Sequence, residues 1–163
     1  MIVAGTGHRP KYMPCQYDEQ HEWALIIKDQ LKEQLQEMKI TKVISGMAIG
    51  WDIALARAAI NLEIPVVCAI PFKGQEAMWP EESQNTYNLV LSLAESVNII
   101  CEGGYEAWKM QKRNQWMVDG ADTILALWDG TPGGTKNCIN YAIKSNKTII
   151  NLYDNFLNFN IKN

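Results

Sequence analysis

Three glycine-rich segments of this sequence carry residue types that could bind a phosphate group. They are Gly5–Pro10 (GTGHRP), Ser45–Asp52 (SGMAIGWD) and Asp129–Thr135 (DGTPGGT). Glycine lets the backbone approach a ligand closely and adopt positive φ angles. Where such a segment leads into a helix, the free N–H groups and the helix dipole favour an anion. One segment alone is weak evidence, whereas three at one edge of a sheet predict a phosphate or nucleotide site.

The polar side chains of these segments suggest how a ligand would be held. Arg9 could form a bidentate pair with a phosphate while His8 donates a hydrogen bond and Thr6 adds a hydroxyl. The alternative for His8 and Arg9 is a salt bridge that orders their own loop. Asp52 could belong to an anion nest or cap a helix. Asp129 could accept from a ribose hydroxyl or cap its own glycine-rich turn.

Several common catalytic and cofactor motifs are absent from the sequence. The first segment is not GxGxxG, because Pro10 stands where the third glycine would be, and there is no GxxxxGK[ST]. No acidic residue closes the second strand to hold a ribose hydroxyl. These absences disfavour a dinucleotide-dependent oxidoreductase and a P-loop NTPase. No cluster with metal-ligand spacing and no Ser-His-Asp or Cys-His arrangement stands out, so we expect neither a metal nor a cofactor.

Short β-branched runs alternate with helical patterns and predict the framework that positions these segments. Strands are expected at Ile2–Ala4, Lys42–Ser45, Val66–Ile70, Val97–Cys101, Thr123–Leu127 and Thr148–Leu152. Helices are expected at 24–38, Asp52–Asn61, Gln84–Leu93, Ala107–Asp119 and Asn137–Ser145. The strands are nearly continuous in apolar character, as parallel strands covered on both faces should be. The pattern predicts an α/β fold with a doubly wound, mostly parallel sheet and helices on both faces, with ligands at the carboxyl ends of the strands.

Length and composition set the class of protein. The 163 residues favour one domain, 1–153, followed by an Asn-rich tail, 154–163. The net charge of -3 argues against a protein that coats nucleic acid. No apolar run could span a bilayer and the start lacks a signal-peptide pattern, so we expect a cytoplasmic protein without a membrane partner. The four cysteines form no CxxC pair and are expected to be reduced.

The motifs together resemble the SLOG superfamily, which includes the DprA/Smf and LOG proteins, and within it the YspA/YpsA-related branch. The resemblance runs over nearly the whole chain. Besides the three glycine-rich segments, it rests on Pro71-Phe72 with Gln75 and Trp79, Arg113-Asn114 with Met117-Val118-Asp119 and Asp122, and Trp128. It implies a Rossmann-like domain that binds a nucleotide or a nucleotide-derived, ADP-ribose-like molecule.

The resemblance also implies which residues contact the ligand. It implies that Arg113 and Asn114 contact the ligand. Trp79 would either stack on a base or pack against a second subunit. The expected binding residues are Gly5, Thr6, Gly7, His8, Arg9, Ser45, Gly46, Ala48, Gly50, Asp52, Trp79, Arg113, Asn114, Asp129, Gly130, Gly133, Gly134 and Thr135.

One departure from the family bears on catalysis. LOG-type enzymes carry a catalytic glutamate three residues after the threonine of PGGxGTxxE, where this chain has Cys138. A thiol cannot replace a carboxylate in acid/base work, although Glu76, Glu81, Glu82 or Asp119 could supply one from elsewhere. The catalytic residues are therefore left unassigned, and a protein without enzymatic activity is favoured.

Three functions follow as expectations. The first is a sensor or sequestering protein for a nucleotide-derived signal, one form being a viral sponge that acts in the host cytoplasm. The second is a LOG-like N-glycosidic hydrolase, a nucleoside monophosphate phosphoribohydrolase. The third is DprA-like binding of single-stranded DNA, which the acidic composition disfavours. Relatives tend to self-associate, so a homo-oligomer is expected.

Overall fold

The computed structural model describes residues 1–13, 16 and 21–154. The strands are β1 (Ile2–Gly7), β2 (Lys42–Ser45), β3 (Val66–Ile70), β4 (Ser96–Ile99), β5 (Thr123–Leu127) and β6 (Thr148–Asn151). The helices are α1 (Glu22–Glu37), α2 (Trp51–Asn61), α3 (Glu81–Leu93), α4 (Ala107–Gly120), α5 (Gly134–Lys144) and a short 3-10 helix, η1 (Pro10–Tyr12). The predicted tail 154–163 lies outside the described residues except for Asp154.

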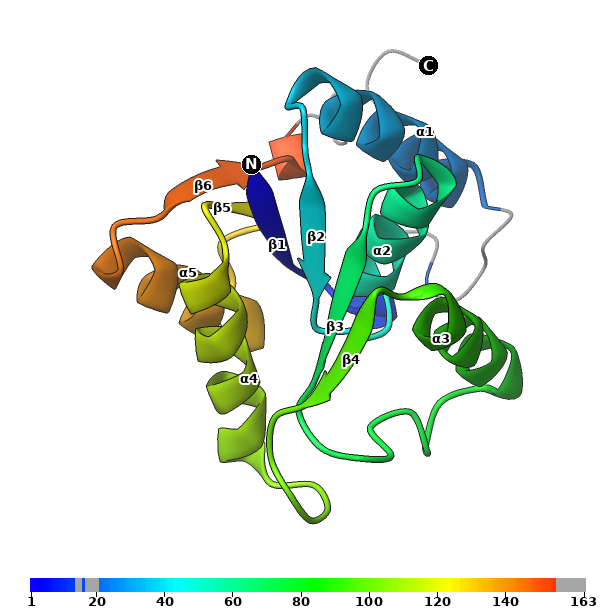
Figure 1. The fold of residues 1–163 in the computed structure, drawn as a ribbon, viewed down its shortest axis with the longest axis vertical. Coiled ribbons are helices and arrows are strands. Elements are labelled where there is room, and N and C mark those ends of the chain that lie inside the picture. Colours follow the sequence, from blue (N-terminus) through cyan, green and yellow to red (C-terminus); the bar gives the residue numbers. More distant parts are fainter. Residues whose placement is uncertain (14–15, 17–20, 155–163) are drawn as a thin grey trace.

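The six strands form one parallel sheet with the order β4-β3-β2-β1-β5-β6 (Figure 1). The chain runs outward from β1 to β4 on one side and from β5 to β6 on the other. The order therefore reverses between β1 and β5, which is where open α/β sheets bind ligands. This arrangement confirms the predicted Rossmann-like, doubly wound fold.

Helices cover both faces of the sheet. Helices α1, α2 and α3 pack on one face, where Leu31, Trp51 and Tyr87 belong to the larger apolar core. Helices α4 and α5 pack on the other, where Met117 and Cys138 belong to the smaller core (Figure 1). The starts of α2 and α5 therefore reach the carboxyl edge of β1 from opposite sides of the sheet.

The ends of the elements differ from the predictions for local reasons. Helix α3 begins at Glu81, because Pro80 caps it and two glutamates in its first turn suit the helix dipole. Strand β1 continues to Gly7, because Gly7 pairs with Leu127 of β5. The expectation that every strand is covered on both faces is wrong for the edge strand β4, where Val97 and Ile99 are 46% and 54% exposed.

No helix among the described residues is both long and apolar enough to cross a membrane. Cys68, Cys101 and Cys138 are free thiols, whereas Cys15 lies outside the described residues.

Candidate ligand-binding site

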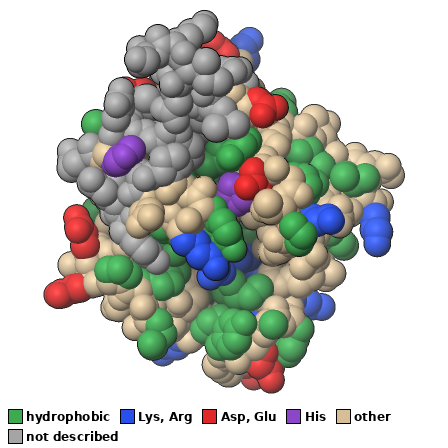
Figure 2. Space-filling view, turned by 180° about the vertical axis from the view of Figure 1, so that it is seen from behind, with side chains coloured by type: hydrophobic (Ala, Val, Ile, Leu, Met, Phe, Trp, Pro, Cys, Tyr) green, Lys and Arg blue, Asp and Glu red, His purple; other side chains and the backbone are tan. Residues whose placement is uncertain are grey.

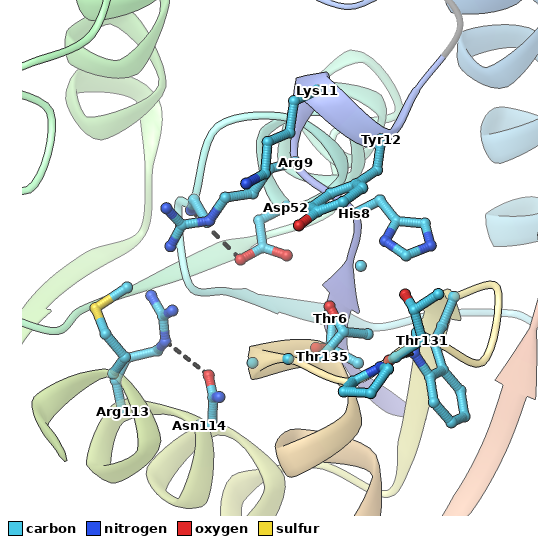
Figure 3. A pocket seen from close by; sticks show the side chains of 17 residues that line it. Thr6, His8, Arg9, Lys11, Tyr12, Asp52, Arg113, Asn114, Thr131 and Thr135 are labelled. Carbon is cyan, nitrogen blue, oxygen red and sulfur yellow. Dashed lines mark hydrogen bonds between the residues drawn. The ribbon is translucent and has the colours of Figure 1, made fainter. Parts of the chain in front are cut away.

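A pocket of about 310 Å³ opens at the carboxyl edge of the sheet, next to the point where the strand order reverses. Its walls come from the segments after β1 and β5, from the start of α2 and from the middle of α4. The lining residues are Thr6, Gly7, His8, Arg9, Lys11, Tyr12, Ala48, Asp52, Met110, Arg113, Asn114, Trp128, Thr131, Pro132, Gly133, Gly134 and Thr135 (Figure 3). This volume is at the lower end of the range for small-molecule sites.

The start of α5 forms one wall of the pocket. Gly133 precedes the helix with φ 146° and no side chain caps the helix start. The N–H groups of the first helical turn lack partners inside the helix, since the bond from Asn137 N–H to the Gly133 carbonyl is the first to close. A Cβ atom added at Gly133 or Gly134 would meet nothing within 4 Å. The helix start therefore offers free N–H groups to an anion.

Arg113 of α4 places a buried cation beside this wall. Arg113 is only 4% exposed. Burial lowers the pKa of its guanidinium, while nearby Asp52 opposes that shift. Nη1 donates to the Gly46 carbonyl, and Nε donates to Oδ1 of Asn114 at 3.0 Å (Figure 3). These bonds engage Nε and Nη1, and no hydrogen bond within the described part of the chain engages Nη2.

Asp52 is the second residue of α2 and the one acidic side chain among the lining residues. Burial raises the pKa of this carboxyl to about 6, against the opposing effects of Arg113, the Ala48 N–H group and Arg9. Oδ2 accepts from the Ala48 N–H group at 3.3 Å. The helix cap is Gly50, so of the two alternatives considered for Asp52 the structure does not show the cap.

Exposed cations stand at the rim of the pocket. Arg9 and Lys11 are exposed, and Lys11 Nζ lies 4.8 Å from the centre of the Tyr12 ring. With Arg113 they give the lining three Lys or Arg side chains against one acid, which favours an anionic ligand. Figure 2, which views the molecule from behind, shows Lys and Arg side chains gathered near the centre of that face.

His8 and Asp129 order the loops around the pocket. His8 is 5% exposed, its Nε2 accepts from the Asp129 N–H group at 3.0 Å, and it lies 3.1 Å from Asp129 Oδ1. The same Oδ1 accepts from the N–H and hydroxyl groups of Thr131, and these bonds lower the pKa of Asp129. The geometry therefore matches the loop-ordering alternative for His8 and the turn-capping alternative for Asp129.

Eleven of the predicted binding residues line the pocket: Thr6, Gly7, His8, Arg9, Ala48, Asp52, Arg113, Asn114, Gly133, Gly134 and Thr135. The structure does not bring the other seven to its walls. They are Gly5, Ser45, Gly46, Gly50, Trp79, Asp129 and Gly130.

Apart from Gly130, the residues left outside the pocket have structural contacts instead. A Cβ at Gly5 would lie 2.7 Å from Leu55, and one at Gly50 would lie 2.6 Å from the His8 carbonyl oxygen. Ser45 donates its hydroxyl to the Asp52 carbonyl at 2.8 Å. Trp79 packs edge-to-face on Tyr87 at 5.4 Å, so it is part of the fold and not a wall of the pocket.

Six lining residues were not predicted: Lys11, Tyr12, Met110, Trp128, Thr131 and Pro132. Trp128, Thr131 and Pro132 lie in or beside a segment that was already singled out, so their position in the chain was a usable signal. Met110 precedes Arg113 by three residues and therefore shares its helix face. Lys11 and Tyr12 reach the pocket because Pro10 starts a short 3-10 helix, which the sequence analysis does not predict.

Among the described residues, no group of three or more His, Cys, Asp or Glu side chains is placed to hold a metal ion.

Comparison with solved structures supports the fold. DprA from Streptococcus pneumoniae superposes with a TM-score of 0.65 at 16% identity, over 90% of this chain and 48% of that protein. DprA from Helicobacter pylori, described for its single-stranded DNA binding mode, gives 0.63 at 18% identity, over 91% of this chain and 63% of that protein. TM1055 gives 0.57 at 17% identity, over 91% and 71%. This chain thus corresponds to about half of the pneumococcal protein.

Comparison with curated sequences gives nearer relatives. The SPbeta prophage-derived protein YoqJ of Bacillus subtilis (strain 168) is 33% identical over 142 residues, 74% of this chain and 82% of YoqJ. A UPF0398 protein of Bacillus thuringiensis (strain Al Hakam) is 26% identical over 167 residues, 97% of this chain and 90% of that protein. The model of the YspA SLOG family matches residues 3–160. The chain therefore belongs to the YspA SLOG family, within the SLOG superfamily.

Proposed function

We propose that this protein binds a nucleotide or nucleotide-derived, ADP-ribose-like molecule, with a phosphate at the start of α5. The observation that carries the proposal is the position of Arg113, which is 4% exposed and lines the same pocket as the uncapped start of α5. The guanidinium already has Asp52 nearby and two hydrogen-bond acceptors, and a phosphate would add to these contacts while it accepts from the free N–H groups of α5. Arg9 and Lys11 would add attraction from the rim.

The chemistry of the pocket favours binding without turnover. Burial raises the pKa of the Cys138 thiol to about 11, so this residue is neither an acid nor a nucleophile near neutral pH. Glu76, Glu81, Glu82 and Asp119 do not line the pocket. A hydrolase of the LOG type would therefore have to use Asp52. We propose that the protein acts as a sensor or as a sequestering protein, a role that would also suit its prophage-derived relative YoqJ.

Binding of single-stranded DNA is the second candidate. It is supported by the likeness to DprA, one example of which is described as binding single-stranded DNA. Tyr12 and Trp128 at the pocket, together with Lys11, are of the types that stack on bases and neutralise a phosphate backbone. The net charge of -3 counts against a long DNA-binding surface. A labelled oligonucleotide that shows no gel shift at low salt would eliminate this candidate.

Self-association is also part of the proposal. The edge strand β4 exposes Val97 and Ile99, and Leu93 at the end of α3 is 57% exposed. Edge strands with exposed apolar side chains are often covered by another chain. Light scattering across a range of concentrations would reveal a dimer or larger oligomer, and a constant monomer mass would refute it.

Thermal stability in the presence of candidate ligands tests the main proposal. Nucleotides, ADP-ribose and its cyclic derivatives would each be added, and each mixture would then be checked by chromatography for breakdown. A ligand at one hundred times its dissociation constant adds roughly 2.7 kcal/mol to the free energy of unfolding. Stabilisation with intact ligand supports a binding protein, whereas released base or ribose phosphate identifies a hydrolase.

Two variants of α4 make this test specific. Arg113→Lys should remove most of the stabilisation, because a lysine cannot reproduce the fork of a guanidinium. Lys112→Ala is the matched control, since Lys112 is exposed and does not line the pocket. The proposal would be contradicted if the ligand stabilised both variants equally, or if no ligand stabilised the unmodified protein.

A further inference from the structure

Within the part of the chain that the structure describes, no protein group donates a hydrogen bond to Oδ1 of the Asp52 carboxyl. Asp52 is 6% exposed, and within the described part of the chain its only side-chain hydrogen bond is from the Ala48 N–H group to Oδ2. The one buried side-chain oxygen or nitrogen without a partner among the described residues is Glu76 Oε2. Oδ1 of Asp52 is therefore not among the fully buried unpartnered atoms, and Asp52 itself lines the pocket.

The position of Asp52 separates it from the helix start proposed for the phosphate. Asp52 enters the pocket from α2, on one face of the sheet, whereas Gly134 and Thr135 enter from α5 on the other. A Cβ atom at Gly5 of β1 would lie 3.9 Å from Asp52 Oδ1, so the carboxyl lies beside the central strand, two residues before that strand ends. Figure 3 shows it near Arg9 and apart from Thr135.

Arg113 compensates the charge of Asp52. A Cβ atom at Gly46 would lie 2.7 Å from Arg113 Nη1 and 2.9 Å from Asp52 Oδ2, so both groups border the same glycine. A carboxylate in this position repels a phosphate but accepts hydrogen bonds from hydroxyl groups. The part of the ligand that lies next to Asp52 must therefore be neutral and must donate hydrogen bonds.

We propose that Asp52 binds the vicinal hydroxyls of a ribose, so that the pocket selects ribonucleotides over 2′-deoxyribonucleotides. The inference rests on the proposed function, because the ribose reaches Asp52 only when a phosphate of the same ligand is held by α5 and Arg113. Adjacent 2′ and 3′ hydroxyls can donate to a single carboxylate, as acidic residues do in other nucleotide sites. The selection would also exclude DNA from this pocket.

Calorimetric titration of the full chain at pH 7.5 tests the inference with three probes: ADP, 2′-deoxy-ADP and inorganic pyrophosphate. ADP should bind at least about tenfold more tightly than 2′-deoxy-ADP, because the deoxy compound leaves a buried carboxylate oxygen unpaired. Pyrophosphate measures the phosphate site without a sugar. Equal affinity for ADP and 2′-deoxy-ADP would overturn the inference.

Variants at two aspartates show whether Asp52 is responsible. Asp52→Asn should bring the two nucleotides to within about twofold of each other and leave pyrophosphate binding equal or tighter, since a negative charge is lost. Asp29→Asn, on the exposed side of α1, should keep the full discrimination. If Asp52→Asn still binds ADP much more tightly than 2′-deoxy-ADP, another residue is responsible for the preference, and the inference is overturned.

A measurement on the unmodified protein covers the case in which Asp52→Asn does not fold. The charged groups facing this carboxyl are Arg113 and Arg9, with the Cys138 thiol near it. With a pKa of about 6 the carboxyl is largely protonated at pH 5, so the preference for ADP should shrink there, with pyrophosphate as the reference at each pH. A preference independent of pH would contradict the assignment. If pyrophosphate binds but ADP and 2′-deoxy-ADP bind with equal affinity, only the inference is refuted. If none of the three probes binds, the proposed function is refuted as well.

Discussion

Two glycine-rich loops at the same edge of the sheet have opposite surroundings. In the loop 45–52, a Cβ at Gly46 or Gly50 would lie less than 3 Å from neighbouring atoms. In the loop 129–135, a Cβ at Gly130, Gly133 or Gly134 would meet nothing within 4 Å. The first loop is closed by packing against the protein, and the second is open to the pocket.

The difference shows that glycine serves two purposes in one site. In the closed loop it lets the segment after β1 approach α2, and the Trp51 N–H group donates to the His8 carbonyl. That packing positions the Asp52 carboxyl, and Arg113 is held by the Gly46 carbonyl. In the open loop, glycine leaves the start of α5 bare for a ligand. The closed loop therefore builds the site, and under the proposed function the open loop contacts the ligand.

The largest effect is expected from Gly50→Ala in the closed loop. Gly50 has φ 105°, and the added Cβ would lie 2.6 Å from the His8 carbonyl oxygen. Backbone strain and this clash together should lower the free energy of unfolding by about 3 kcal/mol or more. Gly104→Ala is the control, because a Cβ there has open space. Denaturant unfolding that gives the same stability for both variants would remove the distinction between the loops.

The Asp52 carboxyl should make stability depend on pH. Its pKa is about 6 in the folded protein and 3.8 as the reference value, so the folded state binds the proton more tightly. Its contribution to stability is complete below pH 3.8 and is lost as the pH rises through 6. Relative to Asp52→Asn, the unmodified protein should lose roughly 2 kcal/mol between pH 4 and pH 7, measured by urea unfolding. A constant difference would place the carboxyl in contact with bulk water.

Gly134→Ala in the open loop should affect binding and not folding. The added methyl has space, and alanine suits a helix better than glycine, so stability should stay equal or rise by roughly 0.5 kcal/mol. The methyl would nevertheless stand at the mouth of the anion site and should weaken pyrophosphate binding about tenfold in calorimetry. Unchanged affinity would move the phosphate away from α5.

The smallest effect is expected from Thr131→Val, which removes the hydroxyl that donates to Asp129 at 2.6 Å. The hydrogen bond is exposed, so the loss of unfolding free energy should be at most about 1 kcal/mol. Ligand affinity should fall only a few-fold, because the turn keeps the bond from the Thr131 N–H group to Asp129. A loss as large as that of Gly134→Ala would assign Thr131 a direct contact with the ligand.

The fold could be predicted because its signals are local. Apolar β-branched runs such as Thr123–Leu127 and alanine-rich segments such as Asp52–Asn61 mark buried strands and closely packed helices without knowledge of their neighbours. The exposed edge strand β4 was misjudged because its apolar residues, Val97 and Ile99, look like those of a central strand. Position in the sheet is a tertiary property that the run does not encode.

The candidate site could be predicted only in part for the same reason. Gly46 and Gly134 have the same residue type in similar segments, yet the first meets Arg113 and Asp52 while the second faces open space. Whether a glycine is packed against other groups or faces open space depends on residues that are distant in the chain. Arg113 was recognised through the family motif, whereas Lys11 had no such signal.

Nuclear magnetic resonance of the isotope-labelled protein, titrated with inorganic pyrophosphate, tests the division between the two loops most directly. The backbone amide signals of Gly133, Gly134 and Thr135 should shift most and saturate together, while those of Gly50 and Trp51 in the closed loop should stay nearly unchanged. The largest shifts at Gly50 and Trp51, or no saturable shifts at Gly133–Thr135, would contradict it.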